Sequence, residues 1–223
     1  MKQQEVVGLI GVKGAGKDTG AAILIKFLGF RRVAFADALY RETADSFGVT
    51  VDFLGNRDTK ETPLPELALR NCTTPGFIDT AFAVAGEKGI ELDLDTPLSP
   101  RWVLQRWGTE FRRIREGHDS YWLDRVDEVI AANPDTNFVV TDVRFKNEAN
   151  YITAVRKGRL VRVRRPVLEA REAQDRIIKG TAAHVSEVEL LTHPTDLEAI
   201  NEEGRPEALA NTLIGWYTGQ KAA

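Results

Sequence analysis

The chain has 223 residues, 43% of them hydrophobic and 28% charged, and its formal net charge is −3. This globular composition excludes wholesale disorder, and the slight negative charge gives no indication of a nucleic acid polymer as partner. A single cysteine, Cys72, excludes a disulfide framework, and three scattered histidines argue against structural zinc. Without a long apolar run or a signal-peptide pattern, we expect a cytoplasmic chain with no membrane contact.

Apolar strand patterns alternate with amphipathic helix patterns, which predicts an α/β domain with a parallel sheet and right-handed crossovers. Strands are expected at 5–10, 32–36, 137–141 and 159–164, with 196–200 as a candidate fifth. Helices are expected at 17–28, 38–47, 99–115, 120–132, 146–156, 167–191 and 206–219. The stretch 49–98 is less regular and holds turn signals around two short helical patterns.

The helix expected at 99–115 has a defined start, with Ser99 as N-cap and Pro100 in the first turn. Its helical spacing predicts a buried stripe of Val103, Trp107, Phe111 and Ile114. The opposite, polar face would carry Arg101, Gln105, Gly108 and Arg112. Guanidiniums bind phosphate well, so this face is a candidate anion site, although a solvated helix face is an equally good interpretation of any single arginine.

The strongest local signal is the segment Gly11-Val12-Lys13-Gly14-Ala15-Gly16-Lys17-Asp18-Thr19, between a predicted strand and a predicted helix. It matches G-x-x-x-x-G-K, in which backbone N–H groups, a helix N-terminus and a lysine bind phosphates. Asp18 stands where the motif has Ser or Thr. This carboxylate would hold Mg²⁺ directly or through water, or would only cap the helix and leave the metal to Thr19 or water. The alternative for the whole segment is an ordinary glycine-rich turn.

A second acidic residue, Asp142, stands at the carboxyl end of the apolar segment 138–141. Ligands of parallel α/β sheets bind at the carboxyl ends of strands, so this carboxylate is placed to assist a nucleotide-bound Mg²⁺. Arg144 follows two residues later. A helix cap is the alternative role for Asp142.

Four segments together resemble the phage-type deoxynucleoside monophosphate kinases, which are P-loop enzymes: GVKGAGKDT, FADALYRE, RWVLQRWGTEFRR with the Asp119 and Trp122 that follow it, and TDVRFKNE. The resemblance spans about 5–205 and is vague in 49–98 and 167–195. Asp196-x-x-x-Ile200-Asn201-x-x-Gly204 is similar to the adenine-side loop of related P-loop kinases such as dephospho-coenzyme A kinase. Tyr40 departs from the lysine that relatives often carry.

The resemblance implies an adenylate-kinase-like parallel sheet of about five strands and transfer of the ATP γ-phosphoryl group to a deoxynucleoside monophosphate, with Mg²⁺. The implied ATP-phosphate ligands are Gly11, Lys13, Gly14, Ala15, Gly16, Lys17, Asp18 and Thr19, with Arg171 and Arg176 on a mobile lid. The implied acceptor residues are Asp37, Arg101, Gln105, Thr109, Arg112, Arg113, Trp122 and Arg144. Lys17, Asp142 and Arg144 would serve catalysis, and Asp18 and Asp142 the metal.

The implied organisation is a single kinase domain with its core at 1–48, 134–165 and 192–223, an acceptor-binding insertion at about 49–133 and a lid at about 166–191. The partners would be small molecules, with a homodimer plausible for the family. Two other functions stay open: another small-molecule P-loop kinase, acting on a nucleoside or on dephospho-coenzyme A, and a non-catalytic nucleotide-binding module. The accepted bases and the choice between deoxyribose and ribose are not readable from the residues.

Overall fold

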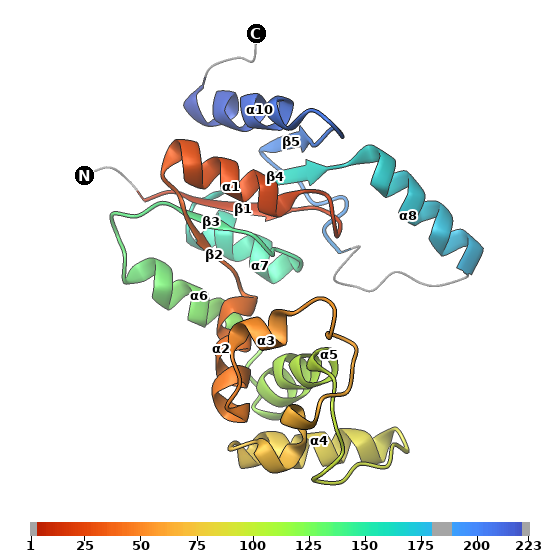
Figure 1. Ribbon diagram of the computed structural model, residues 1–223. Helices are drawn as coiled ribbons and strands as arrows, with labels where there is room; N and C mark the ends of the chain where they lie inside the picture. Colours follow the sequence, from red (N-terminus) through yellow and green to blue (C-terminus); the bar gives the residue numbers. More distant parts are fainter. Residues whose placement is uncertain (1–3, 180–188, 220–223) are drawn as a thin grey trace. The chain divides into compact units, whose positions relative to one another are not determined.

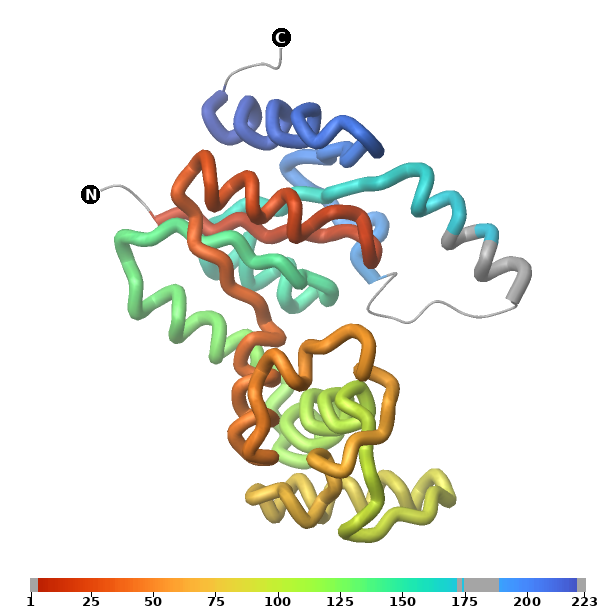
Figure 2. Tube along the Cα trace, viewed as in Figure 1, coloured from red at the N-terminus to blue at the C-terminus, as the bar shows by residue number. Residues whose placement is uncertain are grey.

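The computed structural model describes residues 4–179 and 189–219, which form two compact units (Figure 1). The first unit, here the sheet unit, combines Met1–Ala34 with Asp127–Ala223, and the second, the helical unit, is Phe35–Val126. Figure 2 shows this division by colour, since red, green and blue segments share the sheet unit whereas orange to lime segments form the other. The sheet unit is therefore assembled from both ends of the chain.

The sheet has five strands, all parallel, in the order β2-β3-β1-β4-β5. Their bounds are β1 Val6–Ile10, β2 Arg31–Val33, β3 Phe138–Val140, β4 Arg159–Arg164 and β5 Leu197–Ile200. All five residues of β1 are buried, as expected for a central strand covered on both faces. The predicted parallel sheet and its candidate fifth strand are thus confirmed. The second strand ends at Val33 rather than at 36, because the next helix begins at Ala36.

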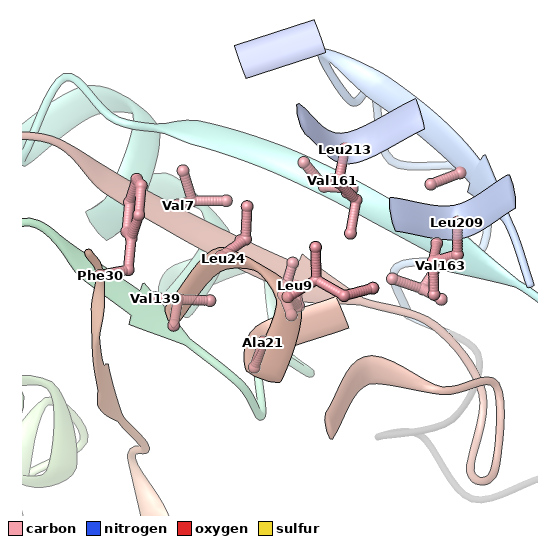
Figure 3. Packing of buried hydrophobic residues seen from close by; sticks show 12 residues of the cluster. Val7, Leu9, Ala21, Leu24, Phe30, Val139, Val161, Val163, Leu209 and Leu213 are labelled. Atoms are coloured by element: carbon pink, nitrogen blue, oxygen red, sulfur yellow. The ribbon is translucent and has the colours of Figure 1, made fainter. Parts of the chain in front are cut away.

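One face of the sheet is covered by α1 (Lys17–Leu28) and α10 (Pro206–Thr218), as Figure 3 shows at close range. The shared core contains Val7, Leu9, Ala21, Leu24, Phe30, Val139, Val161, Val163, Leu209 and Leu213, all nearly or fully buried. Each valine, leucine or phenylalanine side chain in this set contributes about 1.5–3 kcal/mol when fully buried. The core therefore joins strands from both ends of the chain to the two helices.

The other face is covered by α7 (Lys146–Asn150) and the π-helical turn η4 (Tyr151–Val155). Ile152 of η4 is fully buried and packs so closely on β1 that a Cβ added to Gly8 would lie 2.4 Å from its Cδ1 atom. The expected helix 146–156 is thus present, but its second half is wound as a π-helix. Helices on both faces give the three layers of a parallel α/β fold.

Two further helices contribute to the sheet unit: α8 (Pro166–Lys179) belongs to it entirely, and α6 (Tyr121–Ala131) begins in the helical unit and ends in the sheet unit. The helix expected at 167–191 is described from Pro166 to Lys179. The rest of that prediction lies largely in 180–188, outside the described residues. The described chain contains no helix that is long and apolar enough to cross a membrane.

The helical unit contains α2 (Ala36–Phe47), α3 (Val51–Gly55), η1 (Pro65–Leu67), η2 (Leu69–Asn71), α4 (Pro75–Glu87), α5 (Pro100–Gln105) and η3 (Arg106–Arg115). Its core is aromatic. The ring centroid of Phe77 lies 4.7 Å from that of Trp107 and 6.0 Å from that of Phe47, and the centroids of Trp107 and Phe111 are 5.4 Å apart. The 13-residue α4, which carries Phe77, is longer than the short helical patterns expected at 49–98.

Candidate functional site

The loop Gly11–Gly16 joins β1 to α1 at the carboxyl edge of the sheet. From β1 the chain crosses to β2 on one side, and from β3 it crosses to β4 on the other side of β1. In open parallel sheets such a change of direction leaves a crevice at the strand ends, where ligands bind. The loop therefore occupies the position that a ligand site takes in this class of fold.

All three glycines of this loop have backbone conformations that other residues rarely adopt, with φ of 145° at Gly11, 78° at Gly14 and 104° at Gly16. A Cβ added to Gly11 would lie 2.3 Å from the carbonyl oxygen of Val163, and one added to Gly16 would lie 2.2 Å from Nδ2 of Asn201. Both conformation and space therefore require glycine, and the curled backbone has the form of an anion-binding loop.

Lys17 is the first residue of α1, and its ammonium donates hydrogen bonds to the carbonyl oxygens of Gly11 at 2.8 Å and Val12 at 3.0 Å. The side chain thus bends back along the loop and brings its charge to the N-terminus of α1, where the helix dipole is also positive. These residues fit a polyphosphate, because an entering anion would meet both the ammonium and the N-terminal amides.

Two carboxylates suit a nucleotide-bound metal. Asp18 is exposed in the first turn of α1, whose N-cap is Gly16, so Asp18 is not the cap that the alternative required. Asp142 is half-buried just after β3, and the pairing of Val140 with Gly8 places it level with the end of β1. Mg²⁺ is usually held by one or two carboxylates with phosphate oxygens, which this pair could supply. The described residues contain no group of three or more His, Cys, Asp or Glu arranged for a metal.

The capping role left open for Asp142 falls to another residue. Helix α7 begins at Lys146, its N-cap is Phe145, and the buried Glu148 supplies the capping carboxylate. Oε2 of Glu148 accepts hydrogen bonds from the backbone N–H groups of Arg144 at 2.7 Å and Phe145 at 3.1 Å. The backbone of Arg144 is therefore fixed while its side chain is exposed, which suits a guanidinium that meets a ligand.

The start of α8 lies beside the phosphate loop. A Cβ added to Gly14 would lie 3.0 Å from Cδ2 of Leu168. One turn of helix is held by an ion pair, since Arg164 at the end of β4 donates to Oε2 of Glu169 at 2.7 Å. The hydrogen bond to Glu169, followed by the negative charge of that carboxylate, raises the pKa of Arg164. The first turn of α8 is thus held against the end of β4.

The predicted lid is only partly described. Arg171 is exposed on α8. Arg176 lies on the same helix, but its side chain is outside the described part of the chain. The lid at about 166–191 and the contacts of both arginines with ATP remain predictions.

In the helical unit, the expected helix 99–115 begins as predicted. Oγ of Ser99 accepts a hydrogen bond from the N–H of Trp102 at 3.2 Å, and Pro100 is the first residue of α5. The second part, η3, is a ten-residue π-helix. Its i→i+5 hydrogen bonding puts more residues in each turn than an α-helix has, and such segments occur frequently at functional sites.

This change of winding corrects two predictions about the faces of the helix. Val103, Trp107 and Phe111 are buried as expected, but the side chain of Ile114 is 68% exposed. A π-helix has more residues in each turn, so a residue three positions after Phe111 has not rotated far enough around the axis to return to the buried face. Gly108, expected on the polar face, is buried, and a Cβ there would lie 3.3 Å from Leu39.

Arg112 belongs to a network centred on Glu42 of α2. The Glu42 carboxylate accepts hydrogen bonds from Nε of Arg112 at 2.9 Å, from the indole N–H of Trp107 at 3.2 Å and from the hydroxyl of Tyr121. Arg112 also donates to Glu116 at 2.9 Å, and its guanidinium lies 4.8 Å from the ring centroid of Tyr121. Two carboxylates and an aromatic ring therefore fix the guanidinium in one orientation.

The same contacts shift two pKa values. Burial, followed by the hydrogen bond and charge of Glu42, raises the pKa of Tyr121 to about 12. Burial acts to lower the pKa of Arg112, but the hydrogen bonds and charge from Glu116 and Glu42 outweigh it and raise that pKa. Tyr121 is therefore a neutral donor and Arg112 a cation at physiological pH.

The remaining predicted acceptor residues lie mostly along α5 and η3. Arg101 pairs with Glu61, Gln105 accepts a hydrogen bond from Arg106 at 3.1 Å, Thr109 is exposed, and Arg113 is half-buried, as is Asp37 in the first turn of α2. Trp122 is 4% exposed and its indole donates to the carbonyl of Gly108 at 3.1 Å, so it packs in the interior. One helical segment thus gathers the predicted arginines, and no observation tests their ligand contacts.

Sequence reasoning assigned no role to Glu42 and Glu148, which hold site residues in place, and it placed Asn201 only in a segment similar to an adenine-side loop. Glu42 and Glu148 stand in the segments FADALYRE and TDVRFKNE. The capping role of Glu148 could not be recognised from the sequence, because the N-cap three residues earlier is Phe145 rather than the Ser or Thr of a capping box. Nothing local marks Glu42, whose partners lie 65 to 79 residues further along the chain.

The parallel sheet order β2-β3-β1-β4-β5, with helices on both faces and a glycine loop with its lysine between β1 and α1, defines an α/β fold of the P-loop kinase class. No family model matches the chain. Two solved structures align with nearly its full length: an unliganded sugar kinase from a Janibacter species, at 16% identity and TM-score 0.41, and a Thermus thermophilus protein, at 14% and 0.49. Neither score reaches 0.5, so the fold assignment depends on the sheet and the loop.

Sequence comparison is more specific. A protein of Acanthamoeba polyphaga mimivirus that carries the name of a deoxynucleotide monophosphate kinase is 29% identical over 199 residues, covering 83% of this chain and 81% of the relative. The deoxynucleoside-5′-monophosphate kinase of Escherichia phage T5 is 29% identical over 183 residues, covering 66% of this chain and 71% of that protein. The resemblance to the phage-type deoxynucleoside monophosphate kinases is confirmed, and the prediction of a phosphotransferase is supported.

Proposed function

We propose that this protein transfers the γ-phosphoryl group of ATP to a deoxynucleoside 5′-monophosphate in the presence of Mg²⁺, giving the diphosphate and ADP. The observation that carries the proposal is the glycine loop after β1, with the Lys17 ammonium held against its carbonyls. The names of the two viral relatives support the choice of acceptor. The sheet unit supplies the ATP residues in this proposal and the helical unit most of the acceptor residues.

Phosphoryl transfer asks the protein for cations and positioning more than for covalent chemistry, because negative charge spreads over the transferring group. An oxygen of the acceptor phosphate attacks the γ-phosphorus, and the bond to the β-phosphate oxygen breaks as ADP leaves. The acceptor phosphate is already largely dianionic at neutral pH, so its attack requires no general base. Lys17 and Arg144 neutralise charge at the transferring group.

The loop amides and Lys17 hold the ATP phosphates, and Asp18 and Asp142 hold Mg²⁺ directly or through water. The metal, when bound, neutralises phosphate charge and fixes the orientation of the phosphates. A lid formed by about 166–191, carrying Arg171 and Arg176, excludes water that would otherwise hydrolyse ATP. The exposed position of Arg171 on α8 suits that role.

The acceptor is bound by the polar side of α5 and η3, with Arg101, Gln105, Thr109, Arg112 and Arg113, together with Asp37, Trp122 and Arg144. Planar guanidiniums suit the monophosphate because each offers two parallel N–H donors. Arg112 is already oriented by Glu42 and Glu116, which favours a positioned cation over a freely rotating one. A buried Trp122 would act through the packing of Gly108.

An assay of ADP release, coupled to NADH oxidation, tests the proposal with the four deoxynucleoside monophosphates, their ribonucleotides, the nucleosides and dephospho-coenzyme A as acceptors. Turnover with one or more deoxynucleoside monophosphates is the expected result. Turnover with only a nucleoside or dephospho-coenzyme A would show that the acceptor is that compound and not a deoxynucleoside monophosphate. No turnover with any acceptor would favour a nucleotide-binding module. A homodimer and a cytoplasmic location remain predictions from the resemblance and the sequence.

A further inference from the structure

The turn after β5 is bonded to the phosphate loop through one side chain. Asn201 follows Ile200, the last residue of β5, and its backbone N–H donates to the carbonyl of Arg164 at 2.8 Å. Its side-chain Nδ2 donates to the carbonyl oxygen of Ala15 at 3.0 Å. Asn201 is thus fixed by two hydrogen bonds: its backbone is bonded to the end of β4 and its side-chain amide to the loop.

The side chain of Asn201 occupies the space next to Gly16. A Cβ added to Gly16 would lie 2.2 Å from Nδ2 of Asn201 and 3.0 Å from its Cγ. Ala15, the residue whose carbonyl is bound, is fully buried. The requirement for glycine at position 16 therefore comes partly from Asn201 and not only from the positive φ of that residue.

The consequence concerns the peptide group between Ala15 and Gly16. The described chain contains no cis peptide bond. In a planar trans peptide the C=O and N–H bonds point in opposite directions. Because Asn201 holds the carbonyl of Ala15, the N–H of Gly16 must point away from Asn201, and it cannot turn without breaking that hydrogen bond.

We propose that Asn201 is a positioning residue that turns the Gly16 N–H toward the phosphates of the bound nucleotide. This inference rests on the proposed function, because it assumes that a polyphosphate occupies the loop. It differs from the role that the resemblance gives to 196–204, which would place Asn201 beside the base. Without the bond from Asn201, the peptide is free to rotate, and one donor of the phosphate site is no longer oriented before binding.

Two ligands separate the two roles, namely ATP and tripolyphosphate, which has no base or sugar. Asn201→Asp keeps the shape of the side chain but replaces the donor with a carboxylate that repels the Ala15 carbonyl, and Asn201→Ala removes the amide. We expect both variants to bind both ligands about tenfold more weakly, as measured by titration calorimetry. The KM for ATP should rise while the KM for the monophosphate stays constant. Glu207→Gln, an exposed change in the first turn of α10 and outside 196–204, is the control and should behave as the wild type.

Loss of affinity for ATP alone, with tripolyphosphate binding unchanged, would overturn the inference and place Asn201 at the base. Unchanged affinity for both ligands in Asn201→Asp would also overturn it, as would a wild-type chain that binds ATP but no tripolyphosphate. If the wild type binds neither ligand, the proposed function itself fails.

A measurement on the wild type covers the case in which the variants do not fold. The Gly16 amide resonance should move downfield when tripolyphosphate is added, because its N–H becomes a donor to a charged oxygen. An unmoved Gly16 resonance at saturation, with neighbouring loop amides shifted, contradicts the proposed orientation.

Discussion

Replacing Lys17 with methionine separates the role of its charge in catalysis from its role in folding. The substitution keeps an unbranched side chain and removes the ammonium that bonds to the carbonyls of Gly11 and Val12. Hydrogen bonds from a charged donor are worth about 1.5–3 kcal/mol each in stability when buried. Lys17 is only half-buried and water can solvate both carbonyls, so we expect the free energy of unfolding to fall by about 1 kcal/mol.

The expected effect on the reaction is larger. Loss of a group that stabilises charge in a transition state lowers kcat by about 100-fold to 1000-fold, or about 2.7–4 kcal/mol. Kinetics of ADP release at saturating ATP and acceptor give kcat, and urea unfolding of the same preparation gives the stability. Lys26→Met, an exposed change on the same helix, is the control and should leave kcat unchanged.

The reasoning is refuted if kcat of Lys17→Met stays within about threefold of the wild type while ATP is saturating. It is also refuted if the fraction of Lys17→Met that is unfolded under the assay conditions accounts for the whole loss of kcat. In that case Lys17 would be a structural residue of the loop.

Three further predictions concern other parts of the two units. Gly11→Ala should lower the free energy of unfolding by at least about 2 kcal/mol in urea titration and abolish ATP binding, because φ is 145° and the new Cβ would lie 2.3 Å from the Val163 carbonyl; a variant that binds ATP normally contradicts the loop geometry. Arg112→Ala should raise the KM for the monophosphate more than the KM for ATP, and the opposite pattern would move the acceptor site elsewhere. Tyr121 has its pKa raised to about 12, so its contribution to stability is complete below about pH 10 and is lost as the pH rises through 12. Tyr121→Phe should therefore lose less stability between pH 10 and 12 in thermal melts, and a parallel loss in both proteins would exclude Tyr121 as a cause.

Much of the sheet unit follows from local sequence. The helix over 17–28 and the strand over 159–164 coincide with their predicted bounds. Runs of apolar, β-branched residues and a glycine-rich turn act over a few neighbouring residues, so the periodicity alone determines them. The glycine-rich loop was predictable for the same reason, because its glycines, lysine and helix start are consecutive.

The winding of η3 was not predictable in this way. A pattern with α-helical spacing placed Ile114 in the core and Gly108 outside, whereas the structure reverses both. The residues allow both windings, and the packing of Trp107 and Phe111 against Phe77 accompanies the π-helical one. Tertiary packing overrides local propensity at such positions.

The sequence by itself determined that this protein has a parallel α/β sheet with a glycine-rich loop and a lysine after its first strand, because those signals are local. Only the tertiary structure decided how the loop and the arginines are held. Asn201 meets Ala15 across 186 residues of sequence, and Glu42 meets Arg112 across 70. Contacts over such separations leave no periodic trace in the chain, since they depend on the order in which the strands join and on which helix faces pack together.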